Sequence, residues 1–210
     1  MASEADATEQ SPIEPARSAC DDAQAADAGP VEPQLSAEER RRRDDAMAHV
    51  RRLGDPVLKT RALPVSRFDA ELRRQVDWMR DLMEGAVGVG LAATQVGIVE
   101  RVLVYRTEPE SPIVAVINPE IEWRGEELET AEEGCLSIPG VHVDVERNVH
   151  VRVGAVDETG TPFTIEASGL EARVLQHEID HLDGVLMLDR TTREQKREAM
   201  RTWRERHAAE

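Results

Sequence analysis

The pentapeptide His177-Glu178-Ile179-Asp180-His181 constrains this chain more than any other part of its sequence. It has the form HExxH. On an α-helix, residues i and i+4 lie on one face, so His177 and His181 can both point at one metal ion. Glu178 follows the first histidine and is close enough to handle a proton of a metal-bound water. The pattern predicts a helix that carries a metal site, and an exposed, charged helical turn is the alternative.

A catalytic metal site needs about three protein ligands and one open position. Upstream of the motif, Cys135 is the only cysteine in the part of the chain that we expect to fold. A free cysteine is most often a small buried residue, which is the alternative for Cys135. Downstream of the motif, the candidate third ligands are Asp183, Asp189, Glu194, Glu198, Glu205 and His207.

Apolar periodicity predicts an α+β fold. Asp69 is a plausible N-cap of a helix whose apolar stripe, Leu72, Val76, Met79 and Met83, has the spacing of a core face. Strands are expected over 102–105, 113–117, 121–128, 141–145, 149–153 and 162–166, and further helices over 170–181 and 192–207. Asn118-Pro119 is expected to end the second strand.

There are too few β-α-β units in this order for a parallel sheet. We therefore expect mixed or antiparallel sheets packed around a central, metal-binding HExxH helix, with a C-terminal helix. Residues 1–45 are rich in Ala, Glu, Asp, Pro and Ser and contain no aromatic residue. Such a segment cannot bury enough apolar surface to offset its ordering entropy. It is predicted to be a disordered acidic tail, and residues 46–210 are predicted to form one catalytic domain.

Charge and cysteine content exclude several classes of protein. The net charge of −16 argues against an electrostatic DNA-binding protein. No apolar run approaches the ~20 residues that span a bilayer, and the acidic N-terminus is unlike a secretory signal. The chain has two cysteines, and Cys20 lies in the predicted tail, so a structural disulfide with Cys135 is not expected. We expect a cytoplasmic protein with neither a membrane nor DNA as partner.

Three segments together resemble one family. GVGLAATQ at 88–95, EGCLS at 133–137 and QHEIDH at 176–181, in this order, are similar to peptide deformylase. The resemblance runs from about Met47 to the end of the last helix. It implies a metallo-hydrolase that removes the N-formyl group from the formyl-methionine of nascent polypeptides and releases formate. Metal-bound hydroxide would attack the formyl carbon, with Glu178 as general acid/base.

The resemblance also implies a role for each matching position. One metal ion would be held by Cys135, His177 and His181. Gln95 and the backbone N–H of Leu136 would form the oxyanion hole. The peptide would pair with the backbone of Gly88, Val89, Gly90 and Gly134, and Val89, Leu170, Val174 and the His177 ring would line the methionine pocket. The family is associated with Fe(II) in the cell, and Zn(II) or Ni(II) is possible in purified protein.

Residues around these motifs carry further expectations. Arg147 and Asp180 are expected to pair and to help orient a ligand histidine. His142 stands where some family members have an arginine, which puts in doubt a charge-assisted contact to the distal part of the peptide. The basic C-terminal helix suits ribosome docking, which the family's C-terminal extension is linked to, and a solvated amphipathic helix is the alternative.

Two other functions compete with deformylation. A zincin-like endopeptidase would take a ligand from Glu194 or Glu198 and leave Cys135 unbound. A deformylase-like protein without activity would only bind peptides or ribosomes. Intact Gln95 and Glu178, together with the three ligand candidates, argue against that alternative.

Overall fold

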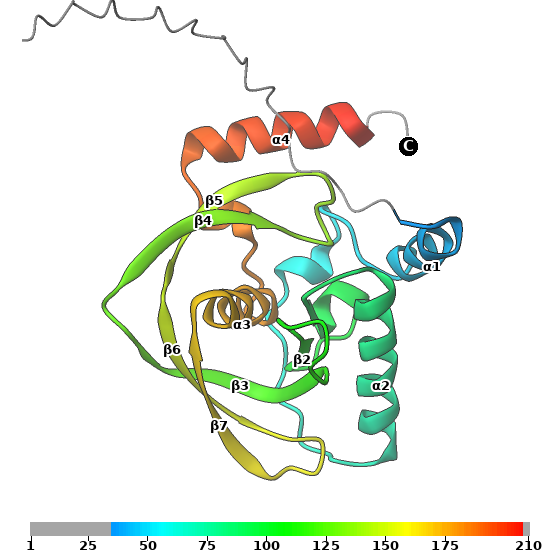
Figure 1. Cartoon of the computed structure of the whole chain (residues 1–210), viewed down its shortest axis with the longest axis vertical. Coiled ribbons are helices and arrows are strands. Elements are labelled where there is room, and N and C mark those ends of the chain that lie inside the picture. The colour runs from blue at the N-terminus through cyan, green and yellow to red at the C-terminus, as the bar shows by residue number, and fades with distance from the viewer. Residues whose placement is uncertain (1–34, 208–210) are drawn as a thin grey trace, which may run out of the picture. The chain divides into compact units, whose positions relative to one another are not determined.

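The computed structural model describes residues 35–207, and residues 1–34 and 208–210 lie outside the described part. Figure 1 shows the elements in chain order. They are α1 (Ala37–Met47), η1 (Pro56–Lys59), α2 (Ala70–Gly85), β1 (Gly90–Ala92), η2 (Ala93–Val96), β2 (Val102–Tyr105), β3 (Val114–Arg124), β4 (Leu128–Gly134), β5 (His142–Asn148), β6 (His150–Val156), β7 (Pro162–Ser168), α3 (Gly169–Leu182), η3 (Met187–Asp189) and α4 (Arg193–His207).

The strands form two antiparallel sheets. One sheet has five strands in the order β1-β2-β3-β6-β7, and β4 and β5 form a two-stranded sheet of their own. Helix α3 lies between these sheets, near the centre of the view in Figure 1. The predicted α+β fold with a central HExxH helix and a C-terminal helix is therefore confirmed.

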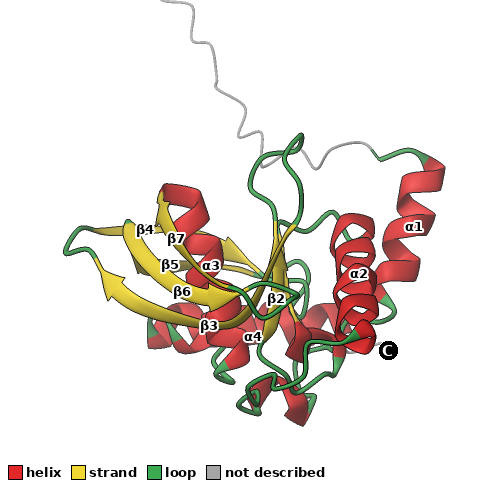
Figure 2. Ribbon diagram, turned by 90° about the horizontal axis from the view of Figure 1, so that it is seen from below, coloured by secondary structure: helices red, strands yellow, loops and turns green. Residues whose placement is uncertain are grey.

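Helices cover both faces of the five-stranded sheet. In β2, Val102 and Val104 pack in the cluster that contains α2, whereas Leu103 and Tyr105 pack in the cluster that contains α3. Burial on both faces explains why β2 is a continuous apolar run rather than an alternating one. Figure 2 shows α2 beside β2, and α1 beside α2.

Several predicted elements are confirmed. The Asp69 side chain caps α2 by accepting hydrogen bonds from the N–H groups of Glu71 and Leu72 at 2.9 and 3.3 Å. The stripe predicted to form the core is buried, with exposed fractions of 4% or less. Strand β5 alternates between exposed and buried residues, as its sequence predicts, with Val143 and Val145 facing inward. Each such fully buried aliphatic side chain stabilises the fold by about 1.5–3 kcal/mol.

The predicted strand end at Asn118-Pro119 was wrong. Strand β3 continues to Arg124, and its register to β6 shifts between Ile117 and Glu120. Asn118 has a φ of 53° and exchanges two side-chain hydrogen bonds with the backbone of Val65, at 2.8 and 2.9 Å. These contacts stabilise a bulge within the strand, because Asn tolerates the left-handed region better than most residues.

The sequence does not predict strands β1 and β4, and the folded part begins earlier in the chain than predicted. Strand β1 lies in the Gly-rich segment, and β4 lies in an acidic segment of which only Leu128 belongs to a predicted strand, the one over 121–128. Helix α1 covers residues that we assigned to the tail. A capping box between Ser36 and Glu39 starts α1, and Ala46 and Met47 are buried at its end, so this part of the tail prediction was wrong. Residues 1–34, the rest of the predicted tail, lie outside the described part.

None of the helices within residues 35–207 is long and apolar enough to cross a membrane.

Candidate metal centre

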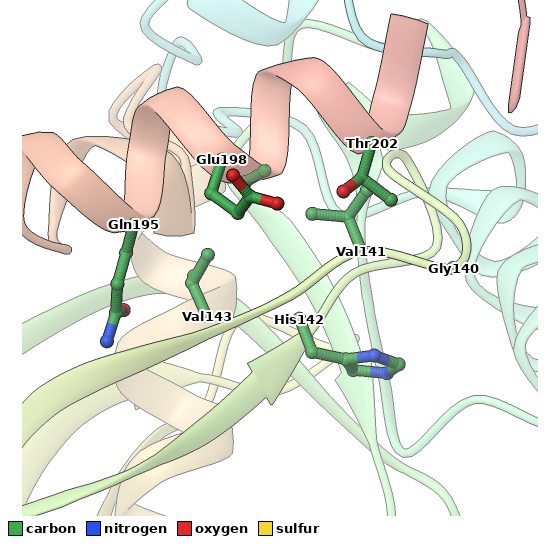
Figure 3. A pocket seen from close by; sticks show the side chains of 8 residues that line it. Gly140, Val141, His142, Val143, Gln195, Glu198 and Thr202 are labelled. Atoms are coloured by element: carbon green, nitrogen blue, oxygen red, sulfur yellow. The ribbon is translucent and has the colours of Figure 1, made fainter. Parts of the chain in front are cut away.

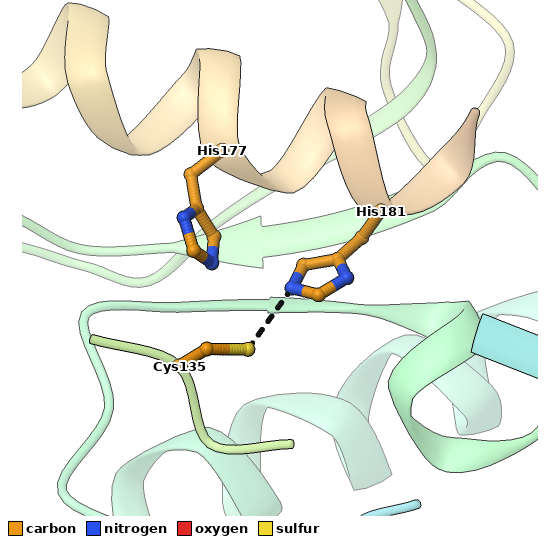
Figure 4. Close-up of side chains that lie close together, drawn as sticks. All are labelled: Cys135, His177 and His181. Carbon is orange, nitrogen blue, oxygen red and sulfur yellow. Dashed lines mark hydrogen bonds between the residues drawn. The ribbon is translucent and has the colours of Figure 1, made fainter. Parts of the chain in front are cut away.

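The three predicted metal ligands come together. Cys135 directly follows β4, and His177 and His181 lie one turn apart on α3. One candidate ligand atom from each residue lies within 4.8 Å of the others, and the Cys135 Sγ is 3.2 Å from the His181 Nε2 (Figure 4). The two rings meet edge to face with centroids 4.9 Å apart. A thiolate and two imidazoles at this separation can surround a single divalent ion.

A carboxylate orients one of the rings. Glu133 Oε2 lies 2.9 Å from the His177 Nδ1, which leaves the Nε2 of that ring facing the centre. Arg147 donates two hydrogen bonds to Glu133, at 2.9 and 3.0 Å, and one to Asp180 at 2.5 Å. The predicted pair of Arg147 and Asp180 is thus confirmed, but the carboxylate that contacts a histidine is Glu133. Sequence reasoning missed it because β4 was not recognised as a strand.

The charged groups at the centre shift one another's pKa values. Burial opposes ionisation of Glu133, but His177 and Arg147 outweigh it and lower its pKa to about 2. Burial likewise opposes a charged His177, but the Cys135 sulfur and Glu133 raise the pKa of that ring well above its usual value. Burial lowers the pKa of His181, and the nearby positive charges of His177 and Arg147 add to this effect. Neutral imidazole at His181 is the form that can ligate a metal.

Glu178 is buried beside the centre, with 4% of its surface exposed. Burial raises the pKa of its carboxyl group to about 7, although His177 and the Ala92 backbone act in the opposite direction. Its Oε2 atom and the Nδ1 of His181 are buried and have no hydrogen-bond partner among the described residues. A carboxyl group with a pKa near 7 can both accept and return a proton at neutral pH.

The Gly-rich segment lies close to Glu178 and to the metal-ligand loop. A Cβ atom added to Gly90 would come within 2.9 Å of the Cγ of Glu178, so only glycine fits there without displacing the carboxylate. A Cβ atom at Gly88 would lie 3.1 Å from the Cδ1 of Leu136. The segments predicted to hold the peptide backbone therefore approach each other at the centre.

Gln95 is buried at the same place. Its Oε1 accepts a hydrogen bond of 2.8 Å from the Ala92 N–H, which fixes the orientation of the amide. Its Nε2 then points toward the Cys135 Sγ at 3.6 Å and the Ser137 Oγ at 3.4 Å. The amide N–H groups are thus directed at the side of the centre that carries Cys135 and Ser137. Ser137 is a further contact that sequence reasoning did not single out.

The residues predicted to line a side-chain pocket differ in exposure. Val174 is buried, whereas Val89 and Leu170 expose 51% and 56% of their surface. Gly134 is exposed, and a Cβ atom there would come within 2.9 Å of the His142 ring. Exposed aliphatic side chains next to a polar centre can contact the apolar part of a ligand.

The acidic candidates of the last helix lie elsewhere. Glu198 pairs with Arg201 and lines a cavity of about 290 Å³ between β5 and α4 (Figure 3). In Figure 3, Val141 and Val143 point toward α4, and the His142 ring lies on the other side of the strand. Glu198 does not belong to the group formed by Cys135, His177 and His181. This placement argues against the endopeptidase alternative.

The residues present fit a metal ion. Three soft or borderline donors converge, and the ring of His177 is held by a carboxylate. The buried Oε2 of Glu178, which has no hydrogen-bond partner within residues 35–207, lies beside them. Such a set on an HExxH helix is typical of a metal-dependent hydrolase.

Comparison with known proteins identifies the family. Residues 47–197 match the model of the polypeptide deformylase family. A peptide deformylase of Parafrankia sp. is 47% identical over 156 residues, which cover 74% of this chain and 85% of that protein. The chain therefore belongs to the peptide deformylase family. It is a metal-dependent hydrolase that removes the N-formyl group from nascent polypeptides.

Solved structures agree with this assignment. The crystal structure of a peptide deformylase from Synechococcus elongatus in complex with actinonin has a TM-score of 0.70 and 46% identity, over 73% of this chain and 85% of that chain. The peptide deformylase from Legionella pneumophila has a TM-score of 0.71 and 37% identity, over 77% of this chain and 97% of that chain.

Proposed function

We propose that Cys135, His177 and His181 hold one divalent metal ion, which is Fe(II) in the cell, and that Glu178 moves the proton during deformylation. The observation that carries this proposal is the convergence of the three ligand atoms within 4.8 Å of one another. Iron binds a given site more weakly than zinc or nickel, so purified protein can carry Zn(II) or Ni(II) instead. When bound, the ion acts as a Lewis acid and lowers the pKa of water.

Side chains and backbone groups of the chain transfer the proton and stabilise the charge that develops during the reaction. Glu178 takes a proton from the attacking water and returns it to the nitrogen of the leaving amine. The Gln95 amide and the Leu136 N–H donate hydrogen bonds to the formyl oxygen as it gains negative charge. The C–N bond of the formamide breaks, so the products are formate and a peptide with a free amino group. The fixed orientation of the Gln95 amide supports its role, because a donor that is already in place needs no reorganisation during the reaction.

The peptide binds as an added strand beside the backbone of Gly88 to Gly90 and of Gly134. Val89, Leu170, Val174 and the His177 ring contact the methionine side chain. The exposure of Val89 and Leu170 supports this role, since apolar groups that are wet in the free protein become buried when an apolar side chain covers them. The His142 ring lies close to Gly134, so it can contact a peptide that pairs with the backbone of that residue.

Formate release from formyl-Met-Ala-Ser tests this proposal directly. The full chain is purified without oxygen, and its metal content is measured on the same sample. We expect rapid release of formate at about one Fe(II) per chain. A fully metallated sample that releases no formate would contradict the proposal and favour a protein that only binds peptides.

We propose in addition that α4 contacts the ribosome in the cytoplasm, where formylated chains emerge. Arg193, Arg197 and Arg204 are exposed on this helix, and cations on one helix suit contact with RNA phosphates. Charge reversal of these three arginines is expected to abolish co-sedimentation with ribosomes and to spare hydrolysis of formyl-Met-Ala-Ser. Charge reversal of the exposed Arg73 and Arg74 on α2 is the control, and an equal loss in both variants would contradict the proposal.

A further inference from the structure

Arg173 connects the HExxH helix to the two-stranded sheet. It lies on α3, one turn before His177, and only 10% of its side chain is exposed. Its Nη1 donates to the Val145 carbonyl at 2.8 Å and to the Glu133 Oε1 at 3.0 Å. Its Nη2 donates to the Glu129 carbonyl at 2.8 Å. One guanidinium group thus serves acceptors on both strands of the sheet.

The position of these acceptors matters for the metal ligands. Glu129 and Glu133 belong to β4, which ends at Gly134, and Cys135 is the next residue. Val145 belongs to β5, the partner strand of β4. The thiol therefore follows the strand that Arg173 holds, whereas both imidazoles lie on the helix that carries Arg173.

A metal site built from two separate elements depends on how those elements are held together. Glu133 contacts both Arg173 and His177, so the same carboxylate joins the guanidinium to a ligand ring. The planar guanidinium group presents donors on two terminal nitrogens in fixed directions, and Arg173 uses both. The three donors of a lysine ammonium group all lie on one nitrogen, so they do not match this geometry.

We infer that Arg173 is a positioning residue, which holds the Cys135 thiolate at binding distance from His177 and His181. The inference rests on the proposed metal set. It concerns the geometry of the ligands and assigns Arg173 no contact with substrate.

Cobalt(II) reports on this geometry without an activity measurement. The full chain and the variants Arg173→Met and Arg173→Lys are loaded with Co(II). The thiolate-to-cobalt charge-transfer absorption is then recorded, together with the rate at which a chelator removes the ion. We expect both variants to show a weaker band and roughly tenfold faster release, since loss of the groups that orient metal ligands typically costs 10–100-fold in affinity.

Arg101 offers a matched control. It is a buried arginine with 11% of its side chain exposed, and it donates to Asp183 Oδ1 at 2.7 Å and to the Pro119 carbonyl at 2.9 Å. Like Arg173, it joins a carboxylate to a backbone carbonyl, but its partners are Asp183 at the end of α3 and Pro119 on strand β3. Arg101→Met is expected to lower thermal stability and to leave the cobalt band and the release rate unchanged.

The outcomes separate this inference from the proposed metal set. A wild-type protein that binds Co(II) without a thiolate band would overturn the metal set itself. A wild-type band that persists unchanged in both Arg173 variants would overturn only the role of Arg173. Equal changes in the Arg101 and Arg173 variants would reduce the effect to general destabilisation and would also overturn it. If Arg173→Met does not fold, the cobalt band and the release rate of Arg173→Lys are compared with those of Arg101→Lys. A change in Arg173→Lys alone supports the inference, and equal values in the two variants overturn it.

Discussion

Glu133 Oε2 lies 2.9 Å from the Nδ1 of His177. A carboxylate two residues before the predicted ligand Cys135 therefore holds the ring of a second predicted ligand, His177. The same carboxylate accepts hydrogen bonds from Arg147 and Arg173. A buried negative charge of this kind is tolerated because it is fully paired. It orients the imidazole and increases the basicity of the nitrogen that would ligate the proposed metal ion.

Replacing Glu133 with Gln should weaken metal binding roughly 10–100-fold, because the amide carries no charge and holds the ring less firmly. Competition with a chelator measures the affinity. Glu132→Gln is the matched control, since Glu132 is the preceding residue on β4 and is exposed. Equal affinities in the wild type and Glu133→Gln would show that the contact does not influence the metal.

Glu178→Gln should abolish turnover and retain the metal. The side chain keeps its shape but can no longer accept a proton, and general acid–base catalysis typically contributes 10²–10⁴-fold to the rate. Formate release and metal content are measured on the same preparation. Glu171→Gln tests for general effects of a change on α3, because Glu171 bonds the Tyr105 hydroxyl at 2.8 Å and not the metal centre. A Glu178→Gln enzyme with near wild-type activity would require another group to move the proton.

Gly90→Ala should reduce activity without unfolding the protein. The new methyl group would lie 2.9 Å from the Cγ of Glu178, so the carboxylate must move away from its position. Gly88→Ala is expected to have a smaller effect, because its methyl group meets the flexible end of Leu136 at 3.1 Å. Steady-state kinetics and thermal unfolding of both variants test this order, and a fully active Gly90→Ala enzyme would contradict it.

Asp189 should contribute stability that is lost in acid. Its burial opposes ionisation, but Lys196, Lys59 and the Leu186 N–H outweigh it and lower its pKa from 3.8 to about 2. Because the pKa is lower in the folded state, the contribution is complete above about pH 4 and disappears as the pH falls toward 2.

The test compares the melting temperatures of the wild type and Asp189→Asn across this range. The variant should melt at a lower temperature at neutral pH, and the difference should shrink between about pH 4 and 2. A difference that stays constant through this window would assign the effect to packing or to the hydrogen bond with Leu186 rather than to charge.

Local patterns in the sequence were sufficient for the elements whose periodicity is strong. Helix α2 shows its core stripe and its Asp69 cap, and strand β5 shows strict alternation, so both were predicted correctly. At Asn118 the sequence predicts a strand end, because Asn-Pro is a common end signal, but the structure has a bulge there. The bulge depends on a contact with Val65, which lies in a distant segment. Strand β4 was missed because its acidic sequence has little apolar periodicity.

The sequence by itself determined the α+β class, the HExxH helix and, with the resemblance to deformylases, the three residues that converge at the centre. Spacing and residue type carry that information, because i and i+4 residues share a helix face. Only the tertiary structure decided which groups hold those residues in place. Glu133 and Arg173 act through buried ion pairs between a strand and a helix that are far apart in the chain, and no local pattern encodes such pairs.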